Sequence, residues 1–169
     1  LPALIYFEDR VPSIYAESDS DDLERVEKWL GKQRAGTTIE EVTDSMLKRL
    51  IQDEQFVAVF FSGPCKAGTV LVEQDCVKIL RQLEKIDDEL DDFGITLVKT
   101  ADIKFAGQTL KVRKFPSLGI FRNGDFLLYK DSLTKDESNL LSWLIDEDTL
   151  RIPGKIEEVN RVMLNRLLD

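Results

Sequence analysis

The sequence repeats itself at a spacing of more than a hundred residues. Residues 1–30 align without a gap on residues 115–144, an offset of 114 positions, and residues 39–51 align on 156–168 at an offset of 117. This period is the size of a domain and exceeds the ~20–50 residues of a solenoid unit. The identical residues in the first alignment include Pro2 with Pro116, Leu4 with Leu118, Phe7 with Phe121, Tyr15 with Tyr129, Asp22 with Asp136 and Trp29 with Trp143.

The two offsets divide the chain into three parts. We expect residues 1–36 to be the C-terminal half of one domain, a β-hairpin plus its last helix, and 37–150 to be a complete domain. Residues 151–169 are then the first strand and helix of a following domain. On this interpretation the chain is a window from a tandem array, and neighbouring repeats of the same chain are its partners. The partial flanks lack central strands, so they expose apolar surface unless something packs on them.

Composition and charge narrow the classes of partner. Hydrophobic residues make up 43% of the chain and charged residues 33%, as in ordinary globular domains. No apolar run approaches the ~20 residues of a membrane helix, so we expect no direct membrane insertion. The net charge of −9 argues against nucleic acid or an anionic membrane surface as partner. Acidic residues cluster at 19–27 and 84–92, which indicates solvated helix faces; weak calcium binding is the alternative.

Residue types that usually carry catalysis are missing. The chain has no histidine, which removes the usual general base and the usual metal ligand. Two cysteines alone cannot form a four-ligand zinc site, and no glycine-rich phosphate loop is present. The sequence therefore predicts neither a metal nor a cofactor.

Hydrophobic patterning predicts a mixed sheet in residues 37–150. An extended piece at 39–42 precedes a helix that we expect Asp44 to cap, and the apolar run 55–61 is typical of a strand buried on both faces. A long amphipathic helix, a strand at 95–98 and at most a short helix in 102–110 follow. An Asn-Gly hairpin then joins 118–121 to 126–129, and Asp136 caps a last helix. Because the first half alternates strands and helices, its crossovers are parallel, and helices cover both faces.

This order of elements, with the segments 111–118 and 121–124, resembles the thioredoxin fold and its protein disulfide isomerase branch. The resemblance implies a three-layer α/β/α domain with a mixed central sheet. It also implies a cis-proline at Pro116, between Phe115 and Ser117, with Pro2 as its counterpart in the preceding repeat. That turn has either an architectural role or the role of presenting backbone to an extended peptide.

Catalysis in the family needs a C-x-x-C pair at the start of the long helix, and two registers for it exist here. One places Cys65 at the attacking position and Gly68 at the resolving one; the other places Glu73 and Cys76 there. Both registers break the pair. The buried carboxylate of the family falls on apolar Val59 in the first register. We therefore expect a domain that is not an enzyme and has lost dithiol chemistry.

The two cysteines leave three alternatives open. Cys65 and Cys76 form a disulfide that staples the inserted segment, they are two inert thiols, or Cys65 is reactive. In secreted or lumenal proteins two cysteines pair more often than not.

The leading functional hypothesis is a redox-inactive repeat that binds a protein or peptide partner, as a chaperone, scaffold or adhesion surface. The resemblance places it in the endoplasmic reticulum lumen or outside the cell. Candidate surfaces are the loop 62–72, the turn at 115–117 and the junctions at 31–38 and 145–155. One alternative is a multi-domain disulfide oxidoreductase whose active pair lies in other repeats. The other is calsequestrin-like, low-affinity calcium binding.

Overall fold

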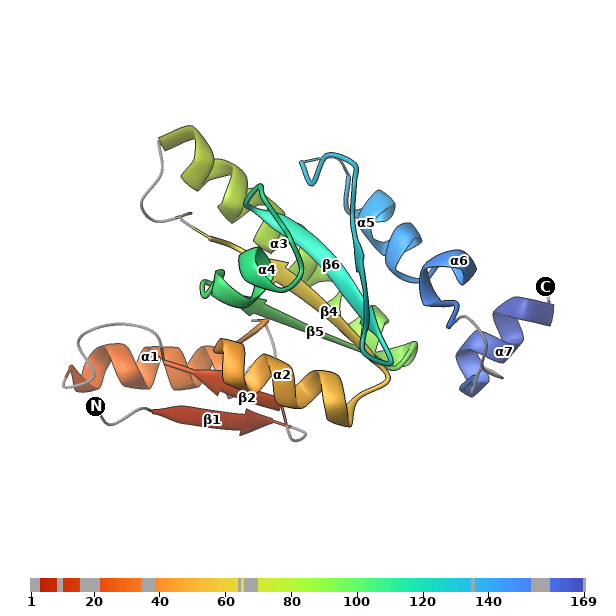
Figure 1. Ribbon diagram of the computed structural model, residues 1–169. Coiled ribbons are helices and arrows are strands. Elements are labelled where there is room, and N and C mark those ends of the chain that lie inside the picture. Colours follow the sequence, from red (N-terminus) through yellow and green to blue (C-terminus); the bar gives the residue numbers. More distant parts are fainter. Residues whose placement is uncertain are drawn as a thin grey trace.

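The computed structural model describes residues 4–8, 11–15, 22–34, 39–63, 65, 70–134, 136–152 and 159–168 (Figure 1). The side chains of Glu8, Val11 and 70–74 are not included in this description. The expected domain boundaries fall partly on 35–38 and 153–158, outside the described residues. The elements are β1 (Ile5–Glu8), β2 (Val11–Ile14), α1 (Leu23–Arg34), β3 (Glu40–Glu41), α2 (Asp44–Asp53), β4 (Phe56–Phe61), α3 (Val70–Asp92), β5 (Ile95–Thr100), α4 (Lys104–Gln108), β6 (Ser117–Arg122), β7 (Asp125–Leu128), α5 (Glu137–Leu144), α6 (Glu147–Leu150) and α7 (Arg161–Leu168).

The central domain contains a five-stranded mixed sheet in the order β3-β5-β4-β6-β7. Strands β3, β5 and β4 are parallel, whereas β6 pairs antiparallel with β4 and β7 pairs antiparallel with β6. The alternating first half and the hairpin in the second half are as predicted. The three-layer α/β/α fold expected from the sequence is therefore confirmed.

Strand β4 lies at the centre of the sheet, and both of its faces are buried. Its six residues are all buried, and alternate side chains enter opposite core clusters. Phe56, Ala58 and Phe60 pack with α3 and α5, whereas Val57, Val59 and Phe61 pack with residues of α2 and α4. Figure 1 shows α3 behind the sheet and α4 in front of it. The nearly continuous apolar run is what a strand covered on both sides requires.

The start of α2 differs from the sequence expectation. Thr43, not Asp44, is the N-cap, and its Oγ1 accepts a hydrogen bond from the Met46 N–H at 3.4 Å. Asp44 is the first helical residue, and its Oδ2 accepts the Phe105 N–H at 3.0 Å. Two adjacent residues could each cap this helix. The tertiary contact with α4 decides between them because it uses the Asp44 carboxylate.

The first flank forms a hairpin, β1–β2, followed by α1, and its elements recur in the central domain at the sequence offset. Strand β2 at 11–14 and strand β7 at 125–128 are 114 residues apart. The rings of Tyr15 and Trp29 lie edge to face at 5.2 Å, and those of Tyr129 and Trp143 do the same at 4.9 Å. The aromatic residues therefore serve packing within a hairpin-plus-helix unit.

The second flank repeats the start of α2. Asn160 is 117 residues after Thr43, and its Oδ1 accepts the Met163 N–H at 3.0 Å, the same spacing of three residues as in the α2 cap. Asn160 Nδ2 also donates to the Asp92 carbonyl oxygen at 3.1 Å, and Arg166 donates to the Ile145 carbonyl oxygen at 2.7 Å. Helix α7 is thereby held at the C-terminal ends of α3 and α5.

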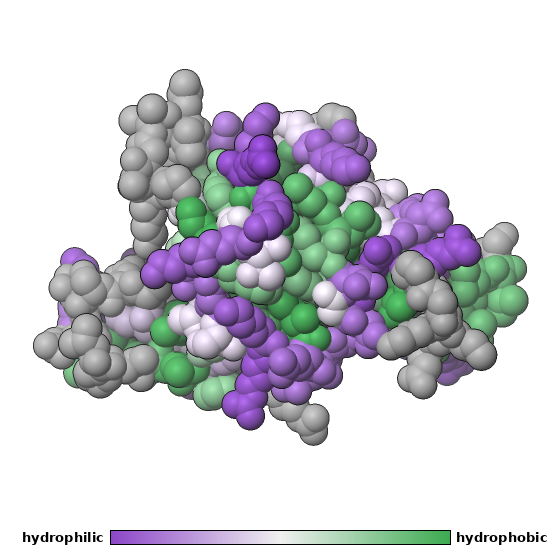
Figure 2. Space-filling model, viewed as in Figure 1, coloured by the Kyte–Doolittle hydropathy of each residue, from purple (hydrophilic) through white to green (hydrophobic). Residues whose placement is uncertain are grey.

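Both flanks expose residues whose counterparts in the central domain are buried. Phe7 is 64% exposed, whereas Phe121 is 2% exposed. Leu164 is 45% exposed, whereas Leu47 is fully buried. Hydrophobic atoms accordingly reach the surface at the end of the molecule formed by α7 (Figure 2). Exposed apolar surface of this kind favours further packing.

Replacement of Gly119 by alanine tests the packing of β6 against β7. An added methyl group would overlap the Phe126 ring and stand 3.0 Å from the Leu127 carbonyl oxygen. We expect Gly119→Ala to lower the free energy of unfolding by about 1–3 kcal/mol, measured by urea denaturation. Gly31→Ala is the control, because nothing lies within 4 Å of its new methyl group. Equal stability of Gly119→Ala and wild type would contradict this packing.

Asp87 on α3 is placed where its charge is disfavoured. Its pKa is raised from 3.8 to about 7, first by burial and then, in decreasing order, by the carboxylates of Glu40, Asp91, Asp88 and Glu84. Between these two values the folded protein holds a proton that the unfolded chain releases. The free energy of unfolding therefore falls as the pH rises from about 4 to about 7.

Asp87→Asn removes this dependence. We expect it to raise stability at pH 8 by about 1 kcal/mol, a value reduced for the partial exposure of the side chain, and to leave stability at pH 4 unchanged. Thermal unfolding at both pH values measures this. Glu89→Gln, an exposed position on the same helix whose charge does not contribute to the Asp87 shift, should change the midpoint little. A gain of the same size at pH 4 and pH 8 would exclude a role for Asp87 ionisation.

Candidate functional site

The loop that follows β4 is tied to its surroundings on two sides. Ser62 donates its N–H and its Oγ to the Thr100 carbonyl oxygen at 3.0 and 3.1 Å, which fixes the loop to the end of β5. Gly63 has a φ of +56°, and a side chain there would collide with Phe115. Only glycine combines this backbone conformation with this close approach. The loop therefore lies directly against the turn at residues 115–117.

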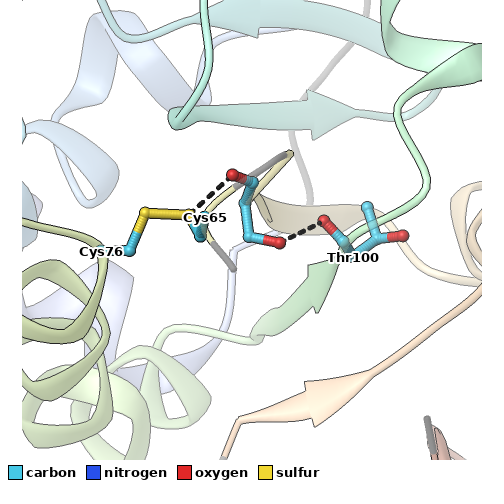
Figure 3. Close-up of a disulfide and its surroundings, with 4 residues drawn as sticks. Cys65, Cys76 and Thr100 are labelled. Carbon is cyan, nitrogen blue, oxygen red and sulfur yellow. Dashed lines mark hydrogen bonds between the residues drawn. A yellow bond between two sulfur atoms is a disulfide. The ribbon is translucent and has the colours of Figure 1, made fainter. Parts of the chain in front are cut away.

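A disulfide joins the loop to the long helix. Cys65 and Cys76 are bonded, with their Cα atoms 6.0 Å apart (Figure 3). Cys76 is 2% exposed on the apolar side of α3, whereas Cys65 is partly exposed. The Cys65 Sγ lies 2.7 Å from the Ser62 carbonyl oxygen. The negative end of that carbonyl dipole faces the sulfur and opposes a build-up of negative charge on it.

The two cysteines lie on either side of the first described turn of α3. Cys65 lies five residues before the first residue of α3 at Val70, and Cys76 lies six residues after it. The positive end of a helix dipole, which favours a thiolate, acts mainly within the first turn of the helix. Gly68 is outside the described residues. Glu73 lies within α3, but its side chain is among those not described.

The position expected for a buried proton acceptor is apolar. Val59 is fully buried in β4 and packs in the core cluster with Val57 and Phe61. A carboxylate at this place would accept the proton of a resolving thiol. Valine has no such group, so this core position gives no help to thiol exchange.

The turn before β6 has a cis peptide bond between Phe115 and Pro116. A groove of about 610 Å³ runs beside it, between the segment 111–117, the N-terminal half of α3 and the segment 128–134. Asp75 and Ile79 of α3 line the groove, and Asp75 is adjacent to Cys76. The disulfide therefore anchors one wall of the groove. Pro2, the expected counterpart of Pro116, is outside the described residues.

Polar groups at this groove are available for a ligand. Ser117 is 8% exposed, and its Oγ has no hydrogen-bond partner among the residues that the structure covers. Such a buried, unpaired hydroxyl is costly, and a ligand that satisfies it would gain accordingly. Burial raises the pKa of Tyr129, and Asp131 raises it further, so its hydroxyl stays protonated at neutral pH.

Sequence reasoning missed the basic side chains at the groove. Lys111, Arg113, Lys114 and Lys130 all line it. The segment 111–114 was informative only through its family resemblance. Its three basic residues in a chain of net charge −9 were a signal that could have indicated a charged surface.

Two other kinds of site are not found in the part of the chain that is described. No group of three or more histidine, cysteine, aspartate or glutamate side chains there could hold a metal ion. Within the same residues, no helix is long and apolar enough to cross a membrane.

Comparison with known proteins gives structural matches alone. No family model matches the sequence, and no curated protein matches it. The solution structure of the first thioredoxin domain of mouse protein disulfide-isomerase A4 matches with 16% identity and a TM-score of 0.53. That match covers 72% of this chain and 85% of the mouse domain.

Longer proteins match as well. Human ERp44 in its zinc-bound form matches with 14% identity and a TM-score of 0.50, over 63% of this chain and 29% of ERp44. ERdj5 matches with 15% identity and a TM-score of 0.52, over 98% of this chain and 21% of ERdj5. The chain thus spans less than a third of either protein. Since these identities are below 20%, the likenesses concern the fold alone, and they show that the chain has a thioredoxin-like fold.

Proposed function

We propose that this chain is a thioredoxin-like repeat that binds protein segments at the groove beside Pro116 and does not catalyse thiol–disulfide exchange. The observation that carries the proposal is the Cys65–Cys76 disulfide, which uses both cysteines to fix the wall of that groove. On this proposal the chain keeps a fold found in thiol–disulfide exchange enzymes, but its two cysteines serve as a structural crosslink.

The loss of exchange chemistry is supported by three independent features. Both cysteines lie away from the start of α3, the Ser62 carbonyl oxygen faces the Cys65 sulfur, and Val59 replaces a proton acceptor. An attacking thiolate needs positive potential, and a resolving thiol needs a base. Val59 supplies no base, and the Ser62 carbonyl oxygen supplies no positive potential at the Cys65 sulfur.

A binding role is supported by the shape and chemistry of the groove. Its volume of about 610 Å³ lies within the range of ligand sites, and its lining combines apolar side chains with a few polar groups. Ser117 and Tyr129, which both carry a hydroxyl group, are among the residues that line it. A peptide can therefore bury apolar side chains and still find hydrogen-bond partners.

The compartment and the array form part of the proposal. A structural disulfide persists in oxidising surroundings, which supports the endoplasmic reticulum lumen or the extracellular space. The recurring ring pairs, the recurring helix caps and the exposed flank residues support a tandem array of such repeats. The match to ERdj5 over 98% of this chain is consistent with that organisation. An array whose other repeats carry an intact C-x-x-C pair would be an oxidoreductase as a whole.

Amide chemical-shift mapping tests the binding site. We expect an unfolded, carboxymethylated protein, titrated into the labelled chain, to shift the amides of Lys111–Ser117 and Leu128–Leu133, because these segments line the groove. Amides of α7 and of α1 should stay unshifted at the same concentrations and serve as internal controls.

An exchange assay tests the other half of the proposal. The chain should not accelerate the reduction of insulin by glutathione, and a Cys65→Ser/Cys76→Ser variant should behave as wild type does. Insulin reduction by wild type that the double variant abolishes would overturn the proposed function. Amide chemical-shift changes confined to surfaces other than the groove would overturn it as well.

A further inference from the structure

The charge at the groove is opposite to that of the chain as a whole. Four basic side chains line it against the two acidic ones of Asp75 and Asp131, although the chain has a net charge of −9. Lys111 is engaged, since its Nζ donates to the Gln108 carbonyl oxygen at 2.7 Å. Arg113, Lys114 and Lys130 are exposed and have no ion-pair or side-chain hydrogen-bond partner within the described part of the chain. These three cationic side chains around one groove can therefore pair with negatively charged groups of a ligand.

The backbone beside these cations is also unpaired. Residues 113–116 make no backbone hydrogen bond to any residue that the structure describes. The segment runs directly into β6, and the buried Ser117 hydroxyl at its end lacks a partner. Unpaired backbone N–H and C=O groups of this kind can be matched by the backbone of an extended peptide. A helix could not use them, because its own backbone groups are already bonded.

The floor of the groove is apolar. Val112, Phe115, Leu128 and Leu133 line it together with Ile79 of α3. Successive side chains of an extended peptide point to opposite sides. One set can therefore enter the apolar floor while the other set reaches the basic rim.

We propose that this groove selects extended peptides in which carboxylate side chains alternate with apolar ones. The inference rests on the proposed binding function and adds the chemical class of the partner. Electrostatic complementarity of this kind sets specificity more than total affinity. A neutral peptide of the same shape would then bind the same groove more weakly.

Fluorescence anisotropy with two labelled peptides tests this inference. The first alternates Asp or Glu with Leu or Val over eight residues; the second carries Asn and Gln in place of the acids. At low salt we expect the acidic peptide to bind about tenfold more tightly than the neutral one. At ~0.5 M salt the ratio should fall below about threefold, because salt screens exposed charges.

Two charge-matched variants locate the effect. Arg113→Glu/Lys114→Glu should reduce binding of the acidic peptide about tenfold or more and leave the neutral peptide almost unaffected. Lys28→Glu/Lys32→Glu changes the net charge equally on α1, away from the groove, and should alter binding less than about twofold. Circular dichroism of both variants confirms that each is folded.

The outcomes separate the two proposals. If both peptides bind equally tightly and compete with each other, the groove binds peptides and the charge selectivity is wrong. If neither peptide binds, the proposed function fails together with the inference. If the acidic peptide binds but the two variants weaken it equally, the attraction comes from overall charge and the inference is overturned.

Discussion

Strand β4 is the constraint on which the rest of the structure depends. It pairs with β5 on one side and β6 on the other, and its two faces supply residues to both core clusters. Because β4 is paired on both sides and covered on both faces, the loop that follows it begins at a fixed place at the edge of the sheet. That loop carries Gly63 against Phe115 and Cys65 toward α3. The packing of one strand thus determines where the disulfide and the groove lie.

The disulfide gives both cysteines a structural role in place of the thiol exchange that is proposed to be lost. The crosslink joins two cysteines that are eleven positions apart, and closing this short loop stabilises the fold by about 2–3 kcal/mol through the entropy of the unfolded chain. It also holds Asp75 and the N-terminal half of α3 in place beside the groove. A rigid wall lowers the cost of ordering on binding, so a partner keeps more of its contact energy.

Much of the fold could be predicted from the sequence because local patterns agree with the tertiary structure. The apolar run in β4, the Asn-Gly hairpin before β7 and the periodicity of α3 each indicate one element in one position. The prediction that Asp44 is the N-cap of α2 was wrong, because its carboxylate contacts the Phe105 N–H, which lies on a segment distant in sequence. The basic rim was missed for the same reason. Arg113 and Lys130 are far apart in sequence, and only the cis-proline turn and β7 bring them to one groove.

The central claim is that both cysteines are consumed in a structural crosslink, and intact mass after alkylation tests it most directly. The native protein is treated with an alkylating reagent, with and without prior reduction. The account predicts no added mass without reductant, even after unfolding in denaturant, and two additions after reduction, at Cys65 and Cys76. Two additions to unreduced protein would contradict it, because both thiols would then be free.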